Sequence, residues 1–214
     1  GFRMKLFKKV LAAALAGVLA LSVLTGCNNS AANVTMVDAL NDWSKVYGEG
    51  ITFEKGNEDL QNQVNALVKI VDEAGKDINF KDAKNIYDMY EAIVNNEAAG
   101  LKLKEWAGQF SKATIDDKNS PLYEYGFADI SATLSASSSK NIYYAEQLMN
   151  TSDAINPPET EQGHHGESNW TVGDKCYVAV ATGEINGKKY MVALFKTTAV
   201  TNPDYKPNSN PGKN

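Results

Sequence analysis

The feature that most constrains this chain is a pair of apolar segments joined by Asn186-Gly187. The segments Cys176–Gly183 and Lys188–Lys196 are rich in residues that favour strands, and Asn-Gly between such segments predicts a hairpin with a two-residue type I′ turn. Pairing across this turn places Ala181 opposite Val192. Both faces of the strand pair are apolar, so both faces need a cover of other elements.

Apolar residues at helical spacing predict the helices that supply this cover. We expect helices over residues 34–47, 58–74 and 81–99, a shorter one that ends near Thr114, and another over residues 141–149. Asn57 is expected to be the N-cap of the second helix. The predicted fold class is therefore α+β, a helix–sheet–helix sandwich with the C-terminal hairpin central to the sheet.

Residues 1–27 have the pattern of an export signal. Met4 is the expected start, three lysines follow within the next five residues, and an apolar segment covers residues 10–24. Leu24-Thr25-Gly26-Cys27 places small residues directly before a cysteine, which resembles the bacterial lipobox. The resemblance implies that Cys27 receives a diacylglyceryl group and anchors an extracytoplasmic protein to the cell membrane.

The charge of the chain without this signal restricts its partners. Residues 28–214 contain 17 lysines, no arginine and 26 acidic residues, a net charge of about −9. Such a charge argues against nucleic acid as a partner and against electrostatic docking on anionic lipid. With Cys27 lipidated, Cys176 has no cysteine partner, and its strand pattern predicts a buried core thiol.

The composition along the chain suggests five segments. After the signal with its lipobox (residues 1–27), we expect a polar tether over residues 28–33 and a helical N-terminal appendage over residues 34–80. The α/β sandwich is expected over residues 81–198. Residues 199–214, rich in Asn, Pro, Lys, Ser and Gly, are expected to be a disordered tail.

Two groups of residues in the second half resemble a known family. Residues 94–103, Val-Asn-Asn-Glu-Ala-Ala-Gly-Leu-Lys-Leu, are followed by Trp106, and Gly163-His164 is followed by Trp170. Both patterns are similar to those of CAP-domain proteins, the cysteine-rich secretory, antigen and pathogenesis-related superfamily. Over residues 83–196 the resemblance implies a CAP-like sandwich that ends in the hairpin.

The resemblance also implies a ligand cleft. The family cavity usually holds two histidines and two acidic residues, to which His164 and Glu146 would correspond. Asp129 stands where the first histidine is expected, which predicts weaker binding of a metal, because imidazole is a preferred ligand of zinc. The candidate cleft residues are Asp129, Glu146, His164, His165, Glu167 and Trp170. Among them, His164 and Glu146 are the candidate ligands of a divalent metal such as zinc.

Three functions stay open at this point. The first is non-enzymatic binding of a small molecule, a lipid or a partner protein by a surface lipoprotein. The second is a metal-dependent hydrolase or peptidase that uses His164 and Glu146. The third is an accessory lipoprotein with a cystatin-like curved sheet, as in nuclear-transport-factor-like domains. We prefer binding, because the sequence has no phosphate loop, nucleophile elbow or His-Glu-x-x-His spacing.

Overall fold

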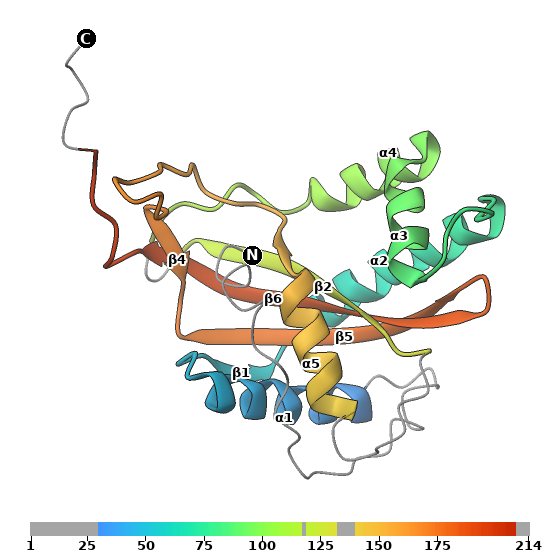
Figure 1. The fold of residues 1–214 in the computed structure, drawn as a ribbon, viewed down its shortest axis with the longest axis horizontal. Helices are drawn as coiled ribbons and strands as arrows, with labels where there is room; N and C mark the ends of the chain where they lie inside the picture. Colours follow the sequence, from blue (N-terminus) through green and yellow to red (C-terminus); the bar gives the residue numbers. More distant parts are fainter. Residues whose placement is uncertain (1–29, 117–118, 132–139, 209–214) are drawn as a thin grey trace.

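A computed structural model describes residues 30–116, 119–131 and 140–208, and Figure 1 shows the fold. The elements, in order, are α1 (Ser30–Tyr47), β1 (Thr52–Lys55), α2 (Glu58–Asp77), α3 (Ile86–Asn95), α4 (Glu97–Ala107), β2 (Pro121–Asp129), α5 (Lys140–Thr151), β3 (Asp153–Ala154), β4 (Trp170–Val172), β5 (Lys175–Ile185) and β6 (Lys188–Thr201). The expected signal and lipobox, residues 1–27, lie outside the described residues.

The hairpin expected at Asn186-Gly187 is confirmed. Both turn residues have positive φ, 49° at Asn186 and 79° at Gly187, as a type I′ turn requires. β5 and β6 pair in the expected register, with Ala181 opposite Val192. Cys176 is buried in β5, and burial raises the pKa of its thiol well above the usual range.

This hairpin is the centre of a mixed sheet. The strand order is β1-β5-β6-β2-β3, and β4 pairs with the far end of β6. β1 is parallel to β5, whereas the other pairs are antiparallel. The strand β2, which contains Tyr125 and Phe127, pairs with β6 on the side away from β5.

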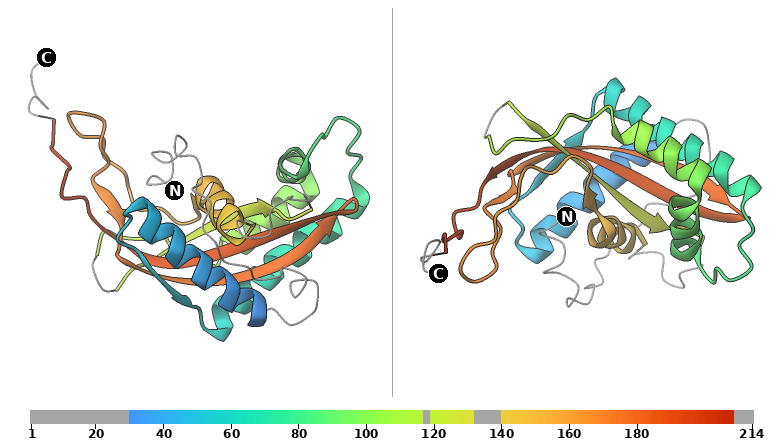
Figure 2. Two further views of the ribbon diagram at one scale, coloured as in Figure 1. Left: turned by 60° about the horizontal axis from the view of Figure 1, so that its bottom comes forward. Right: turned by 90° about the horizontal axis from the view of Figure 1, so that it is seen from above.

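Helices cover both faces of the sheet (Figure 2). α1 and α5 pack on the face that carries Val178 and Phe195, and α2, α3 and α4 enclose the face that carries Ala179 and Leu194. Burying a large apolar side chain contributes about 1.5–3 kcal/mol, so each core stabilises the sheet.

The helix expected over residues 81–99 is divided in the structure into α3 and α4. The chain leaves helical geometry at Asn96, where ψ is 132°, and the Asn96 side chain accepts a hydrogen bond from the backbone N–H of Ala99. Asparagine at this position is a strong N-cap, so it starts a new helix instead of continuing the old one. The resulting α3–α4 elbow stands at one end of the sheet (Figure 1).

The N-terminal segment belongs to the same packed body as the second half. α1 begins at Ser30, within the expected tether, and Asn33 is buried. Residues 34–80, expected as an appendage, supply α1, β1 and α2 to the two cores and to the sheet. The physical reason is that the apolar faces of the central hairpin are larger than the helices of the second half can cover.

The C-terminal segment is ordered further than expected. β6 continues to Thr201 and pairs there with β4. Beyond it, the backbone N–H of Asn202 donates to the carbonyl oxygen of Asn169 at 3.0 Å, and the N–H of His164 donates to the carbonyl of Lys206 at 2.8 Å. Backbone pairing therefore overrides the polar composition that predicted disorder from residue 199. Residues 209–214 of the expected tail lie outside the described part of the chain.

Candidate ligand-binding site

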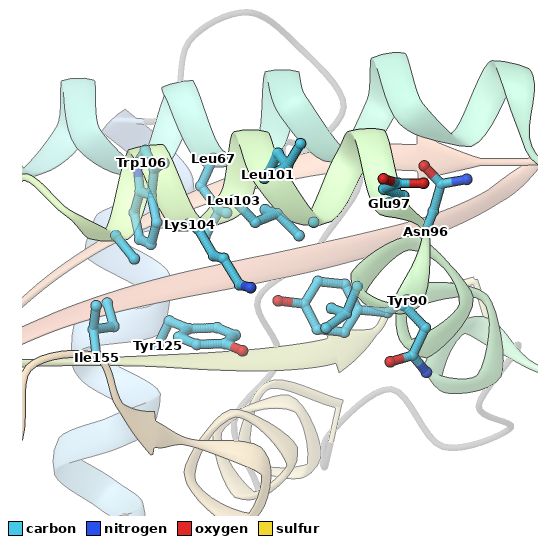
Figure 3. Close-up of a pocket in the computed structure, with 14 residues that line it drawn as sticks. Leu67, Tyr90, Asn96, Glu97, Leu101, Leu103, Lys104, Trp106, Tyr125 and Ile155 are labelled. Atoms are coloured by element: carbon cyan, nitrogen blue, oxygen red, sulfur yellow. The ribbon is translucent and has the colours of Figure 1, made fainter.

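A cavity of about 530 Å³ lies between the α3–α4 elbow, α2 and the sheet, and we call it the elbow pocket. Figure 3 shows its lining side chains. The lining residues are Leu67, Tyr90, Val94, Asn95, Asn96, Glu97, Gly100, Leu101, Leu103, Lys104, Trp106, Ala107, Tyr125 and Ile155. The size falls within the range of about 300–1,000 Å³ that is usual for small-molecule pockets.

Aromatic side chains form fixed walls of the elbow pocket. The indole N–H of Trp106 donates to the Gln63 carbonyl of α2 at 2.9 Å, and the indole packs edge-on against Phe110 at 5.1 Å between ring centroids. Tyr90 of α3 lies 4.7 Å from Phe127 of the sheet, measured between ring centroids. These contacts join α4 to α2 and α3 to β2, so the pocket walls are held in position before a ligand binds.

Three polar groups of the elbow pocket, one of them on the exposed Lys104, lie beside its apolar residues. Figure 3 shows the ammonium of Lys104 and the hydroxyls of Tyr90 and Tyr125 directed toward one another. Burial, and then the neighbouring Tyr125, raise the pKa of Tyr90 well above its usual range. The Tyr90 hydroxyl therefore stays neutral at physiological pH.

The mouth of the elbow pocket combines apolar side chains with the exposed polar residues Asn95, Asn96, Glu97 and Lys104. Leu101 is 62% exposed and Val94 is 41% exposed, and both line the cavity. Large apolar side chains exposed together at a cavity mouth are typical of binding surfaces. No residue among those that line the cavity is a serine, cysteine or histidine. The arrangement is suited to holding an apolar molecule.

A second, larger hollow is less suited to a ligand. It measures about 960 Å³ and lies beside α1, where Asp38, Asn41 and Ser44 line it. The side chains of Asn41 and Ser44 already bond the backbone of Phe53 and Ile51, respectively. These two polar side chains are thus occupied in fixing the chain at β1, and the elbow pocket, with its aromatic walls, is the stronger candidate.

The expected histidine site is an exposed loop that is tied to the C-terminal segment. His164 and His165 are exposed, with ring centroids 4.6 Å apart. The Glu167 carboxylate accepts hydrogen bonds from the backbone N–H of His165 at 2.9 Å and of Lys206 at 2.8 Å. Hydrogen bonds from backbone N–H groups, its own first and that of Lys206 next, hold the pKa of Glu167 below its usual value. Glu167 thus connects two backbone segments.

Trp170 and Gly163 also have structural roles in this loop. Trp170 is buried in the core under α1 and α5, and its indole N–H donates to the Thr160 hydroxyl at 2.8 Å. A side chain at Gly163 would collide with the Glu167 carboxylate and the Lys206 carbonyl. Close packing of the loop explains the glycine before His164.

The two other expected residues lie elsewhere. Asp129 ends β2, and its carboxylate accepts a hydrogen bond from the backbone N–H of Ser131 at 2.8 Å. Glu146 is on α5, where burial raises its pKa. Burial, and then the charge of Glu146, raise the pKa of Tyr47 on α1. In Figure 1, α5 crosses the middle of the sheet, whereas the loop before β4 lies at the end near the C-terminal segment.

The expected metal ligands are accordingly not gathered into a centre. Within residues 30–116, 119–131 and 140–208, no group of three or more His, Cys, Asp or Glu side chains could hold a metal ion. Glu146 is on α5, whereas His164 lies in the exposed loop before β4. A zinc centre built on this pair finds no support in the described part of the chain.

The elbow pocket was not expected from the sequence, although residues 94–103 were noted for their family resemblance. The missed signal is Asn95-Asn96 before Glu97, because asparagine followed by an acidic residue is typical of a helix start. This signal predicts the elbow. It does not predict the cavity, because Leu67, Tyr125 and Ile155 come from distant parts of the chain.

Comparison of the chain with protein-family models, curated proteins and solved structures gives no match. Over the residues that the structure describes, no helix has the length and apolarity to cross a bilayer.

Proposed function

We propose that this protein is an extracytoplasmic, lipid-anchored binding protein that holds a small apolar molecule in the elbow pocket without changing it chemically. The observation that carries the proposal is the cavity of about 530 Å³, with aromatic walls and a few convergent polar groups. This combination is characteristic of small-molecule sites. We also propose that residues 83–196 have a CAP-like fold, because of their resemblance to CAP domains.

The pocket is tested by calorimetric titration with 2-naphthamide, a neutral apolar probe that is small enough for the cavity. We expect a dissociation constant of about 0.1 mM, given the usual free energy gained per atom by small ligands. Ala107→Trp should abolish binding, because Ala107 lines the pocket and an indole would fill it. Ala98→Trp is the matched control, because Ala98 is on the same helix, exposed and outside the lining.

Two results would contradict this proposal. Equal binding by the wild type and Ala107→Trp would place the probe elsewhere on the molecule. A lack of measurable binding by the wild type would remove the pocket as a ligand site. Circular dichroism of each variant checks that the fold is kept.

The anchor is tested separately at Cys27. We expect the wild type to fractionate with membranes of a bacterial host and to carry the added mass of a diacylglyceryl group. Cys27→Ser should release the protein from the membrane fraction, because no other residue of the lipobox can form the thioether. A Cys27→Ser protein that stays in the membrane fraction would contradict the lipid anchor.

A further inference from the structure

The polar groups of the elbow pocket indicate which class of apolar molecule it selects. Lys104, Tyr90 and Tyr125 come from α4, α3 and β2, respectively, and direct their polar atoms to one place among apolar side chains (Figure 3). This inference rests on the proposed function, because it assigns a ligand class to the same pocket.

The ammonium of Lys104 has no anionic partner in the part of the chain that the structure describes. Glu97, the one carboxylate among the lining residues, is seven residues earlier on the same helix, about 10 Å along the axis at 1.5 Å per residue. Figure 3 shows Glu97 beside Asn96 at one end of the pocket, with its carboxylate apart from the ammonium of Lys104. The place beside Lys104 therefore suits an anion supplied by a ligand.

The two tyrosines add hydrogen-bond donors at the same place. Burial, followed by the neighbouring Tyr125, keeps Tyr90 protonated. If one of the two hydroxyls donates to the other, the second still has a free O–H. A carboxylate accepts several hydrogen bonds through its two oxygens, so it can use this O–H and the ammonium of Lys104 together.

The rest of the pocket limits the ligand to one carboxylate. Leu67, Leu103, Trp106 and Ile155 offer apolar surface next to the three polar groups. At the far end, the carboxylate of Glu97 would repel a second negative charge. We propose that the elbow pocket selects monocarboxylates with an apolar body, with the carboxylate held by Lys104, Tyr90 and Tyr125.

The test compares 2-naphthoate with 2-naphthamide, two probes of the same shape that differ in charge, by calorimetry at neutral pH and low salt. We expect the wild type to bind the carboxylate about tenfold more tightly, which is typical of charge-assisted hydrogen bonds. Lys104→Met should remove this difference, measured as the ratio of the two dissociation constants, because the variant lacks the ammonium that pairs with the carboxylate. Lys102→Met is the matched control, because Lys102 is exposed on the same helix and does not line the pocket.

Two further measurements sharpen the assignment. Tyr125→Phe should reduce the preference for the carboxylate severalfold, because one donor is lost while the ring remains. Naphthalene-2,6-dicarboxylate should bind more weakly than 2-naphthoate, because its second charge points toward Glu97.

Equal affinities for naphthoate and naphthamide, or a preference that survives Lys104→Met, would overturn the carboxylate assignment while the pocket itself stands. Tighter binding of the dicarboxylate would overturn the restriction to one carboxylate. If neither naphthoate nor naphthamide binds, the proposed function fails, and the ligand class fails with it.

Discussion

At the scale of single residues, Asp72 shows how one carboxylate joins a helix to the sheet. Its Oδ1 accepts hydrogen bonds from the Tyr190 hydroxyl at 2.7 Å and from the backbone N–H of Glu184 at 3.1 Å. Gly183 leaves room for this contact, because a Cβ there would collide with Asp72 and Tyr190. Burial raises the pKa of Asp72, although the two hydrogen bonds act in the opposite direction.

The raised pKa predicts how pH changes the contribution of Asp72 to stability. The folded state binds the proton of Asp72 more tightly than the unfolded state. Its contribution therefore favours folding below the ordinary pKa of 3.8 and is lost as pH rises through the folded pKa. We expect the free energy of unfolding of the wild type to fall relative to Asp72→Asn as pH rises from about 3 to about 7. Urea denaturation of both proteins across this range measures the difference, and a relative rise would contradict the prediction.

At the scale of elements, side chains supply the hydrogen bonds at the edge of a strand where the neighbouring strand ends. β1 pairs with β5 only as far as Val178. Beyond that point, the side-chain oxygen of Asn33 accepts from the backbone N–H of Val180 at 2.8 Å, and the amide of Gln61 donates to the Val180 carbonyl at 3.0 Å. Asn33 also donates to Gln61 at 2.7 Å. Two helix amides thus take the place of a further strand residue.

Removing the Asn33 side chain should destabilise the folded protein. Asn33→Ala would leave the buried N–H of Val180 without its acceptor, so we expect the free energy of unfolding to fall by about 1–3 kcal/mol. Chemical denaturation provides the measurement. Asn62→Ala is the control, because Asn62 is exposed on α2 and should change stability by less than about 0.5 kcal/mol. Equal effects of the two substitutions would show that the Asn33 contact is unimportant.

At the scale of the whole molecule, the two cores are shared between the first and second halves of the chain. α1 and β1 contribute Trp43 and Phe53 to one core, and α2 contributes Leu60 and Leu67 to the other. Both cores include strands from the second half. Neither half can therefore bury its apolar surface alone.

This sharing predicts the outcome of a truncation. A chain limited to residues 81–208 should lack a cooperative unfolding transition, because both faces of the hairpin would lose helices that cover them. A chain of residues 30–208 should unfold in one transition. Thermal circular dichroism and amide NMR dispersion distinguish the two. A well-dispersed spectrum from residues 81–208 would mean that the N-terminal helices are dispensable.

The most accurate sequence predictions concern features that local chemistry decides. Asn186-Gly187 is suited to a turn with two positive φ angles, and this turn fixes the register of β5 against β6. Asn57 is the N-cap of α2, as expected, and accepts from the N–H of Leu60 at 2.9 Å. The prediction of α2 was also accurate, because the spacing of its apolar residues indicates which face of the helix is buried in a core.

The candidate site could not be predicted from the sequence in the same way. The histidine loop was predicted to be a site because His164 and His165 lie together there. In the structure, hydrogen bonds connect this loop to the backbone of the C-terminal segment. In the elbow pocket, Lys104 is one of many lysines in the sequence. What distinguishes it is proximity to Tyr90 and Tyr125, which no local pattern records.

The sequence by itself determined the hairpin, its register, the two apolar faces and the need to cover both. Only the tertiary structure decided that β1 joins β5 in parallel, that α1 and α2 complete the cores, and that a pocket opens at the α3–α4 elbow. The physical reason is the separation in sequence between the residues that interact. Turn geometry and helical periodicity act between residues close in the chain, whereas the parallel pairing and the pocket depend on packing between segments far apart in sequence.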